Sequence, residues 1–434
     1  MRRIETTFSN FFRREATGGI LLIIFTLLAI LFANIPAFSF INNLWTKDIH
    51  LTFGSSSFHF TLQHVINDGL MAVFFFVVGL EIKREMRHGE LSSIRKACFP
   101  IVAAIGGMVL PAIIYKLVNI NVEGEAARGW GIPMATDIAF AVGVVSMLGK
   151  RVPLSLKIFL MTLSIVDDLG AIIVIALFYP SHDLHLNMLF YAAIIFGILM
   201  FMNYIRVKSS ILFIIGGIVL WFFIFNSGIH ATIAGVLLAL AIPAESRINE
   251  MRFFIQSKHL LGKFKEAYSK DFNFTMNKEE QEVIEQLSRN IESVRPMTLK
   301  LEHSFHTFVM FIIMPLFALA NAGVCFQSIS HEQLTSTVSI GIFLGLVVGK
   351  PLGILSLSYL AVKLKIASIP ENIKWKHIFS IGCLAGIGFT MSLFINGLAF
   401  SSETMVNSGK VSILIGSLVI GVIGWFMCKK TLKN

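Results

Sequence analysis

Five ionisable residues lie well inside strongly apolar stretches of this 434-residue sequence. They are Asp68, Asp137, Asp167, Asp168 and Lys350. A charged group in the middle of a membrane-spanning helix costs about 3 kcal/mol on insertion scales, so these side chains are expected to face a bundle interior and to pair or line a water-filled cavity. A structural ion pair between helices would explain any one of them. Five together indicate a site that handles charge.

Asp167 and Asp168 are adjacent, and neighbours on a helix project about 100° apart. One can therefore line a cavity while the other approaches a different helix. Two carboxylates this close in a medium of low dielectric constant cannot both ionise cheaply, so a proton or a cation must neutralise them. Their oxygens suit hard cations, and no His or Cys beside them suggests a transition-metal site. A site that takes either protons or one small cation exchanges them by competition, the simplest form of antiport.

Lys350 lies between Gly349 and Pro351, too far from the expected cytoplasmic end of its apolar stretch to reach the membrane surface easily. A lysine buried in this way needs an anionic partner or gives up its proton readily. We expect Lys350 to be either the structural counter-ion of Asp167 or a proton carrier in its own right.

Two apolar stretches, 129–137 and 385–392, contain residues that weaken helices. The interrupting residues are Gly131, Pro133, Gly386 and Gly388, and Thr136 and Asp137 follow the first pair. Carbonyls freed by a break can ligate a cation, and half-helix ends carry partial charges that need opposite partners. An isolated Gly or Pro is usually only packing or a kink. Paired breaks beside ionisable residues are instead typical of a transporter's binding site.

The composition identifies the protein that carries these residues as a membrane protein. Apolar residues make up 55% and charged residues 14%, with a mean hydropathy of +0.75, whereas a soluble chain is about 25% charged. The four cysteines form no C-x-x-C pair and lie in or beside apolar stretches. They are interpreted as small buried hydrophobic residues, and no cofactor is predicted.

Twelve apolar stretches are long enough to be predicted as membrane-spanning helices. They are approximately 18–35, 62–82, 97–118, 127–149, 153–179, 186–205, 210–226, 228–243, 304–325, 337–362, 378–400 and 409–428. With both termini in the cytoplasm, the inside segments hold 21 Lys and Arg residues and the outside segments four. This asymmetry sets the orientation. The net charge of +10 is therefore a topological signal, and nucleic acid is not an expected partner.

The predicted fold class is an all-α polytopic membrane protein. Its third to fifth and tenth to twelfth spans would be inverted three-helix repeats, because each set starts from the opposite side of the membrane. Residues 45–62 alternate in polarity around a Gly-Ser-rich turn and predict a small external β-hairpin. An isolated hairpin is marginal in water, so it either pairs with its copy in a dimer or lies on its own helices. Residues 245–301 form a charged cytoplasmic insertion in which Val283, Leu287, Ile291 and Val294 follow helical spacing.

Taken together, these features resemble the NhaA-type Na⁺/H⁺ antiporter family of bacteria over essentially the whole chain. The most specific segments are NDGLMAVFFFVVGLE at 67–81, ATDIAF at 135–140, DDLGA at 167–171, GIHAT at 228–232, PLFALANAG at 315–323, GKPLG at 349–353 and GIGFTMS at 386–392. The family has inverted repeats with broken helices.

The resemblance implies a homodimer in the bacterial inner membrane that expels Na⁺ or Li⁺ in exchange for protons. In that picture Asp168 and Asp167 bind the cation and the protons, with Asp168 the more direct ligand. Thr136 and Asp137 lie where the broken helices cross. Asp137 would compensate the positive half-helix ends, and Lys350 the negative ones while also pairing with Asp167. The family moves more protons than sodium ions per cycle and is electrogenic.

Members of the family are also activated as the cytoplasmic pH rises. The matching charged positions at the inner mouth are Glu81, Arg84, Glu85, Glu302, His303 and His306. Histidine titrates in the appropriate range, although interfacial anchors or positive-inside charges would give a similar pattern. His230 lies near the outer side and is interpreted as a packing or hydrogen-bonding residue in preference to a sensor.

Two other classes of protein use intramembrane carboxylates. An intramembrane aspartyl protease needs two of them on separate spans, which Asp137 and Asp167 could supply, but its usual Gly-x-Gly-Asp arrangement does not occur. A cation channel could use the same carboxylates for selectivity, although broken helices in opposed repeats favour alternating access. Everted vesicles with a pH-sensitive dye separate the three classes, because a channel passes Na⁺ without obligatory proton counterflow and a protease passes neither.

Overall fold

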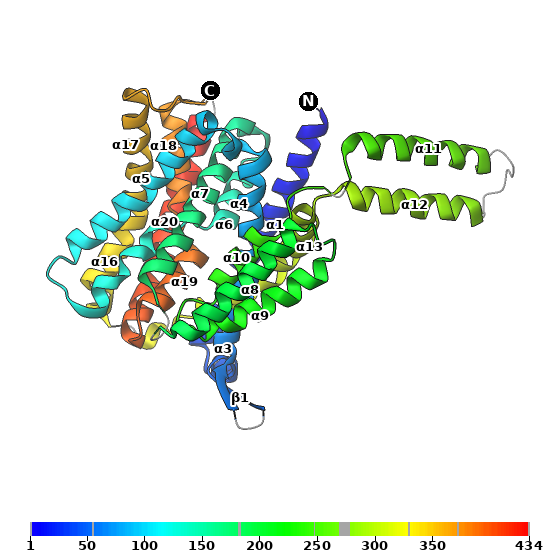
Figure 1. Ribbon diagram of the computed structural model, residues 1–434. Coiled ribbons are helices and arrows are strands. Elements are labelled where there is room, and N and C mark those ends of the chain that lie inside the picture. Colours follow the sequence, from blue (N-terminus) through cyan, green and yellow to red (C-terminus); the bar gives the residue numbers. More distant parts are fainter. Residues whose placement is uncertain are drawn as a thin grey trace.

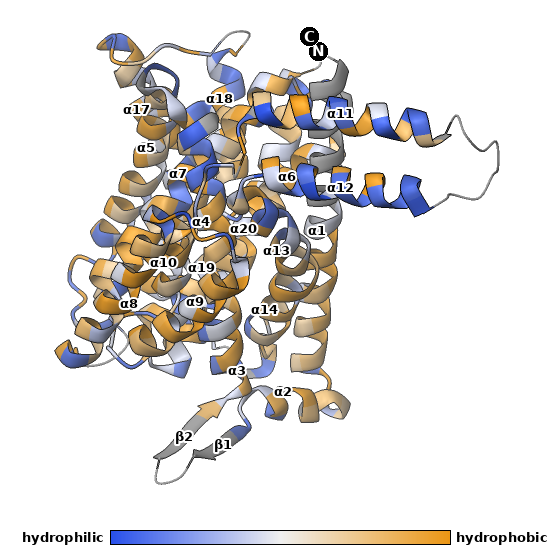
Figure 2. Cartoon of the chain, turned by 45° about the vertical axis from the view of Figure 1, so that its right-hand side comes forward, coloured by the Kyte–Doolittle hydropathy of each residue, from blue (hydrophilic) through white to orange (hydrophobic). Residues whose placement is uncertain are grey.

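The computed structural model describes residues 2–53, 56–180, 184–246, 248–268, 278–328, 330–370 and 373–432. Most helices run side by side in one bundle (Figure 1). The first helix begins and the last one ends at the same end of this bundle, and the strands lie at the opposite end (Figure 1). The hydropathy colouring is predominantly apolar along the bundle helices (Figure 2). The chain is therefore a multi-pass membrane protein built almost entirely of helices.

The helices of the first half cover residues 2–241. They are α1 (Arg2–Asn34), α2 (Ser39–Trp45), α3 (Leu62–His64), α4 (Met71–His88), α5 (Ile94–Val118), α6 (Ile138–Met147), α7 (Leu154–Phe178), α8 (Leu186–Tyr204), α9 (Ser210–Phe225) and α10 (Ile233–Ala241). Those of the second half are α11 (Glu250–Tyr268), α12 (Lys278–Val294), α13 (Met297–Phe308), α14 (Met314–Asn321), α15 (His331–Leu334), α16 (Thr337–Leu344), α17 (Lys350–Lys363), α18 (Trp375–Ala385), α19 (Phe389–Ala399) and α20 (Glu403–Thr431).

Two other helix types interrupt or connect these elements. The 3₁₀ segments are η1 (Pro36–Phe38), η3 (Glu90–Ser92), η4 (Gly124–Met134), η5 (Gly149–Arg151) and η7 (Phe326–Ser328). The π segments are η2 (Val65–Leu70), η6 (Val309–Ile313) and η8 (Gly345–Gly349). Such segments often mark strained or functional positions in a helix. Asp68 lies within η2, and Lys350 directly follows η8.

Within the described residues, nine helical stretches are long and apolar enough to cross a membrane, and α18 with α19 forms a tenth span bent by 50°. The predicted spans 210–226 and 228–243 correspond to shorter helices, α9 with 16 residues and α10 with nine. The chain turns at Gly228, whose φ of 86° favours glycine. The helical part of this predicted span therefore begins only at Ile233. The count of twelve crossings and the inverted repeats stay predictions.

Two segments stand apart from the bundle. Strands β1 (Asp48–Phe53) and β2 (Ser56–Thr61) pair antiparallel, with Asp48 opposite Thr61 and Phe53 opposite Ser56. Gly54 and Ser55 of the predicted turn lie outside the described residues. Helices α11 and α12 form a helical hairpin that projects sideways near the end of the bundle that holds the termini (Figures 1 and 2). The predicted helical stretch 283–294 is part of α12.

A close helix crossing joins α5 to α17 through glycines. A Cβ atom at Gly106 would overlap the backbone carbonyl of Gly353, and a Cβ at Gly353 would overlap that of Gly106. At the next residue, a Cβ at Gly107 would approach Ile354 Cγ1 to 2.9 Å. Small residues at such crossings let membrane helices approach closely and gain packing contacts. The α5–α17 contact holds Lys350, the first residue of α17, at a fixed place in the bundle.

Replacing Gly106 with Ala is therefore expected to push α5 away from α17. Overpacking of this kind costs about 1–3 kcal/mol and should lower the melting temperature of the detergent-solubilised protein. Gly197→Ala in α8 is the matched control. Apart from the backbone of α8 itself, no atom of the described residues lies within 4 Å of a Cβ built there, and Ala favours a helix over Gly. Equal melting temperatures for Gly106→Ala and the parent would contradict the close crossing.

Candidate ion-binding site

Helix α7 carries Asp167 and Asp168 in its middle. The helix is 25 residues long and its other residues are mainly apolar, so the two carboxylates are held far from either end. Asp167 is 2% exposed and Asp168 4% exposed. The structure thus places both acidic residues in the bundle interior.

Two interrupted helices cross beside α7. In the first, the 3₁₀ segment η4 ends at Met134 and α6 begins at Ile138; in the second, α18 and α19 are separated by 386–388. The extended backbone of one break bonds to the other break. Asp137 N donates to the Ile387 carbonyl at 2.7 Å, and the Thr136 hydroxyl donates to the Ala385 carbonyl at 2.9 Å. The two predicted breaks therefore meet in space, but the first lies at 135–137, because Gly131 and Pro133 remain within η4.

The Asp137 carboxylate caps the N-terminal ends of two half-helices at once. Its Oδ1 accepts a hydrogen bond from Phe140 N of α6 at 3.0 Å. Its Oδ2 accepts from Thr390 N of α19 at 3.1 Å and from the Thr390 hydroxyl at 2.5 Å. Helix N-termini carry unpaired N–H groups and partial positive charge, so one buried carboxylate can stabilise both.

Lys350 contacts groups of negative charge, whereas Asp137 contacts the positive ends of helices. Its Nζ donates to Asp167 Oδ2 at 2.6 Å and also to the backbone carbonyl of Met134, the last residue of η4. The side chain is 1% exposed. Lys350 thus joins a buried carboxylate to the partially negative end of an interrupted helix, and Thr136 lies beside the same carboxylate.

One oxygen of the acidic pair is left without a hydrogen bond. Asp167 Oδ1 is buried and has no partner among the described residues. The electrostatic surroundings of the Asp168 carboxylate include the charges of Asp167, Asp137 and Lys350. Lys350 offsets one of the two carboxylates on α7. The pair therefore keeps one negative charge that a monovalent cation or a proton could balance.

Two tyrosines that were not predicted as site residues hold η4 in place. Tyr115 OH donates to the Ala126 carbonyl at 2.6 Å, and Tyr179 OH donates to the Arg128 carbonyl at 2.6 Å while accepting from Gly131 N at 3.1 Å. Gly131 is needed here, since its Cβ would approach Tyr179 OH to 2.5 Å. An uninterrupted 3₁₀ helix of 11 residues is uncommon. External hydrogen bonds of this kind compensate its poorer internal geometry.

Two hydroxyl groups, Ser392 of α19 and Ser417 of α20, complete the crossing. Ser392 Oγ donates to the Ile132 carbonyl at 2.8 Å, and Phe389 N donates to Ser417 Oγ at 3.2 Å. Thr390 and Ser392 were not among the predicted site residues, although they lie in the predicted break segment 385–392. Hydroxyl side chains directly after a glycine break were the signal for a capping role.

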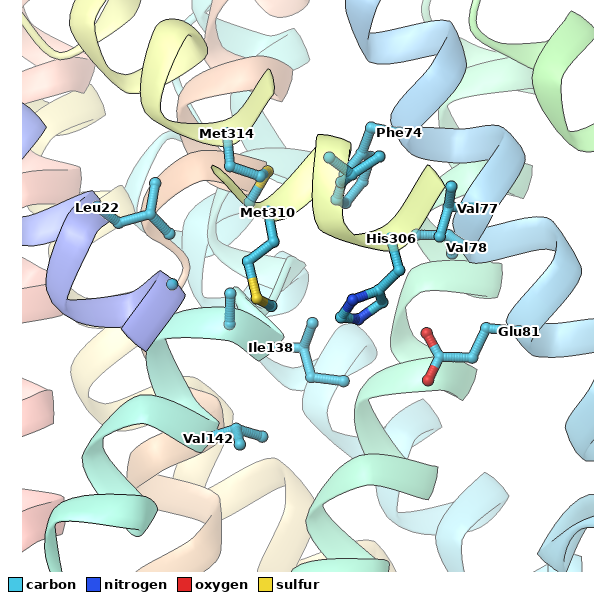
Figure 3. A pocket seen from close by; sticks show the side chains of 13 residues that line it. Leu22, Phe74, Val77, Val78, Glu81, Ile138, Val142, His306, Met310 and Met314 are labelled. Carbon is cyan, nitrogen blue, oxygen red and sulfur yellow. The ribbon is translucent and has the colours of Figure 1, made fainter. Parts of the chain in front are cut away.

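The charged residues predicted at the inner mouth form a second cluster. Arg84 pairs with Glu81 at 3.4 Å, with Glu85 at 3.1 Å and with the buried Glu302. His306 lies one helical turn after Glu302 and contributes to its electrostatic surroundings. Glu81 and His306 line one cavity of about 60 Å³, which is large enough for water. Figure 3 shows the Glu81 carboxylate and the His306 ring on the same side of this cavity.

The other predicted site residues lie elsewhere. His303 is on an exposed face of α13. His230 Nε2 is 3.7 Å from Asp68 Oδ1, and its Nδ1 is 3.0 Å from Thr232 Oγ1. The His230 ring is buried and packs edge-on against Phe394. The structure thus brings together Thr136, Asp137, Asp167, Asp168 and Lys350, and it places Asp68 with His230 in a separate pair.

Comparisons of the sequence with known proteins identify its family. The family model described as Na⁺/H⁺ antiporter 1 matches residues 9–428. The Na(+)/H(+) antiporter NhaA 2 of Helicobacter hepaticus is 44% identical, over 97% of this chain and 95% of the relative. The NhaA antiporter of Wolinella succinogenes is also 44% identical, over 98% and 93%. That of Sulfurimonas denitrificans is 42% identical, over 100% and 97%.

These matches confirm the resemblance found in the sequence. They extend over nearly all of the chain and nearly all of each relative, so the apolar spans and both broken segments fall inside the shared region. The chain belongs to the Na⁺/H⁺ antiporter 1 family, and it is accordingly a secondary transporter and not an enzyme.

Proposed function

We propose that this protein exchanges Na⁺, or Li⁺, for protons at the Asp167–Asp168 pair. The relatives named as Na⁺/H⁺ antiporters support the transported ions. The observation that carries the proposal for the site is the charge balance of the buried acidic pair. Asp167 and Asp168 are two buried carboxylates beside a single buried ammonium group, Lys350, which pairs with Asp167.

Competition follows from the cost of buried charge. An unbalanced carboxylate in a low-dielectric interior is strongly unfavourable, so Asp168 must carry either a proton or a bound cation. A sodium ion prefers several oxygen ligands, and the unpaired Asp167 Oδ1 is available beside Asp168. A protonated Asp168 has lost the charge that attracts the ion. The two ligands therefore exclude each other from one site.

Electrogenic exchange needs a second proton for each sodium ion. Asp168 supplies one, and the Lys350–Asp167 pair can supply the other in two ways. Either Asp167 takes a proton when Lys350 moves away, or Lys350 itself gives up its proton when the cation takes over its place beside Asp167. Both versions use the same contact at 2.6 Å, and both move two positive charges inward for one outward.

Asp137 and Lys350 also link ion binding to the broken helices. Asp137 holds the N-termini of α6 and α19, and Lys350 holds the end of η4 through the Met134 carbonyl. A change of charge at Asp167 therefore acts on a group that supports η4. Movement of half-helices around a fixed site near the midplane is a general basis of alternating access.

The same contacts argue against the two rival classes. Asp137 is engaged with two helix ends and Asp167 with Lys350, so neither is placed to share and activate a water molecule as in an aspartyl protease. A channel would not need a lysine paired with one of its selectivity carboxylates.

We place the protein in the bacterial inner membrane with both termini in the cytoplasm, as a homodimer joined through the 45–62 hairpin.

We further propose that the Arg84 cluster senses cytoplasmic pH. Three carboxylates surround one guanidinium group, and His306 lies next to Glu302. Glu81 also contributes to the electrostatic surroundings of Asp168. Protons that bind this cluster therefore alter the field at the transport site.

Asp168→Asn is expected to abolish Na⁺-driven proton movement in everted vesicles, because the amide keeps the shape of the side chain but neither titrates nor carries charge. Folding should be retained, as judged by yield and by size-exclusion chromatography. Glu332→Gln, an exposed change in α15, serves as the control and should transport normally. Parent-like flux in Asp168→Asn would remove this residue from the mechanism.

Lys350→Ala should both slow transport and destabilise the protein. Removing one partner of a buried ion pair typically costs about 3–5 kcal/mol, here because Asp167 and the Met134 carbonyl lose their donor. The double variant Lys350→Ala/Asp167→Asn removes the orphaned charge and should recover much of the lost thermal stability. A Lys350→Ala protein that melts at the parent temperature would show that Lys350 is not the counter-ion.

Glu302→Gln should shift the activation profile to higher pH. The amide imitates the protonated carboxyl group permanently, and the family is activated as protons leave. The measurement is the pH at which vesicle exchange is half-maximal. Glu285→Gln, an exposed carboxylate that pairs with Arg289 on α12, is the control. Identical profiles for Glu302→Gln and the parent would exclude Glu302 from the pH response.

A further inference from the structure

A serine on α7 has a hydroxyl group that behaves unlike most others in the bundle. Hydroxyls in these helices typically donate to the carbonyl four residues earlier, as Thr26 does to Leu22 at 2.6 Å and Thr162 does to Ile158 at 2.9 Å. Ser164 lies on the same helix as Thr162 and is completely buried, yet its Oγ has no hydrogen-bond partner among the described residues. A buried hydroxyl without a partner is unfavourable and needs an explanation.

The position of Ser164 explains why its hydroxyl group has no partner in the chain. It precedes Asp167 by three residues and Asp168 by four, the two spacings that place side chains next to each other on a helix. Side chains on a helix lean toward its N-terminus, so both carboxylates lean back over the turn that carries Ser164. The hydroxyl therefore lies on the N-terminal side of the acidic pair along α7, on the helix face between its two members.

Two buried oxygen atoms on this stretch of α7, Ser164 Oγ and Asp167 Oδ1, lack a hydrogen-bond partner among the described residues. The buried Asp168 carboxylate lies on the same stretch of the helix. Alkali cations bind to several oxygen atoms at once, whereas a proton needs only one. A neutral hydroxyl adds a ligand without changing the charge balance that makes proton and cation compete.

We propose that Ser164 Oγ is a further ligand of the transported alkali cation, beside the Asp168 carboxylate and Asp167 Oδ1. This inference rests on the proposed function and extends it, since it assigns a role in cation affinity to a residue that carries no charge. The proposed ligand role affects cation binding and proton binding differently. Loss of the hydroxyl weakens cation binding and leaves proton binding nearly unchanged.

The test measures Na⁺-dependent proton flux in proteoliposomes for Ser164→Ala and Ser164→Cys. Cysteine keeps the volume of serine but offers a soft sulfur that binds alkali ions poorly. Both variants should raise the apparent Michaelis constant for Na⁺ by about tenfold, as expected for the loss of one polar contact. Maximal flux at saturating Na⁺ and melting temperature in Na⁺-free buffer should stay at the parent values.

Ser358→Ala is the matched control. Ser358 is also completely buried and its hydroxyl also lacks a partner in the described chain, but it lies on α17, eight residues after Lys350. Its Michaelis constant should equal that of the parent. Parent-like constants in both Ser164 variants would overturn the proposal, as would an equal rise in Ser358→Ala. A parent protein without Na⁺-driven flux would instead refute the proposed function itself.

Discussion

The structure depends on the compensation of helix ends inside a membrane. Each broken helix leaves backbone N–H and C=O groups without helical partners in the membrane interior, where neither water nor lipid tails can form hydrogen bonds with them. Asp137 satisfies the N-terminal ends of α6 and α19, the Thr136 hydroxyl covers the end of α18, and Lys350 covers the end of η4. Two of these groups are charged, so the breaks bring charge into the bundle. The pairing of Lys350 with Asp167 then leaves Asp168 as the carboxylate that a mobile ion must balance.

This arrangement explains why transport and stability are linked in the same residues. Lys350 contacts both a carboxylate of the acidic pair and the backbone of an interrupted helix. The tyrosines at 115 and 179 fix the remainder of η4 from α5 and α7, and the glycine crossing of α5 with α17 fixes the backbone at Lys350. A charge change at one site is therefore transmitted through direct contacts and needs no long pathway.

Much of this site could be predicted because charge and helix breaks are costly in apolar segments. The five intramembrane ionisable residues and the two glycine-rich breaks were identified on that basis, and four of the five ionisable residues meet at the crossing. Tyr115, Tyr179 and the 3₁₀ conformation of 124–134 could not be predicted, since tyrosine is ordinary in such stretches and its hydrogen bonds depend on tertiary packing. The separate Asp68–His230 pair and the short α10 likewise arise from the turn near Gly228, which hydropathy alone does not show.

The most direct test of the central claim is to measure Na⁺ binding to the purified protein by calorimetry at a series of pH values. Competition for one acidic pair predicts that the apparent affinity falls as the solution becomes more acidic, and that Na⁺ binding releases protons to the buffer. A sodium affinity independent of pH, with no proton release, would contradict the account.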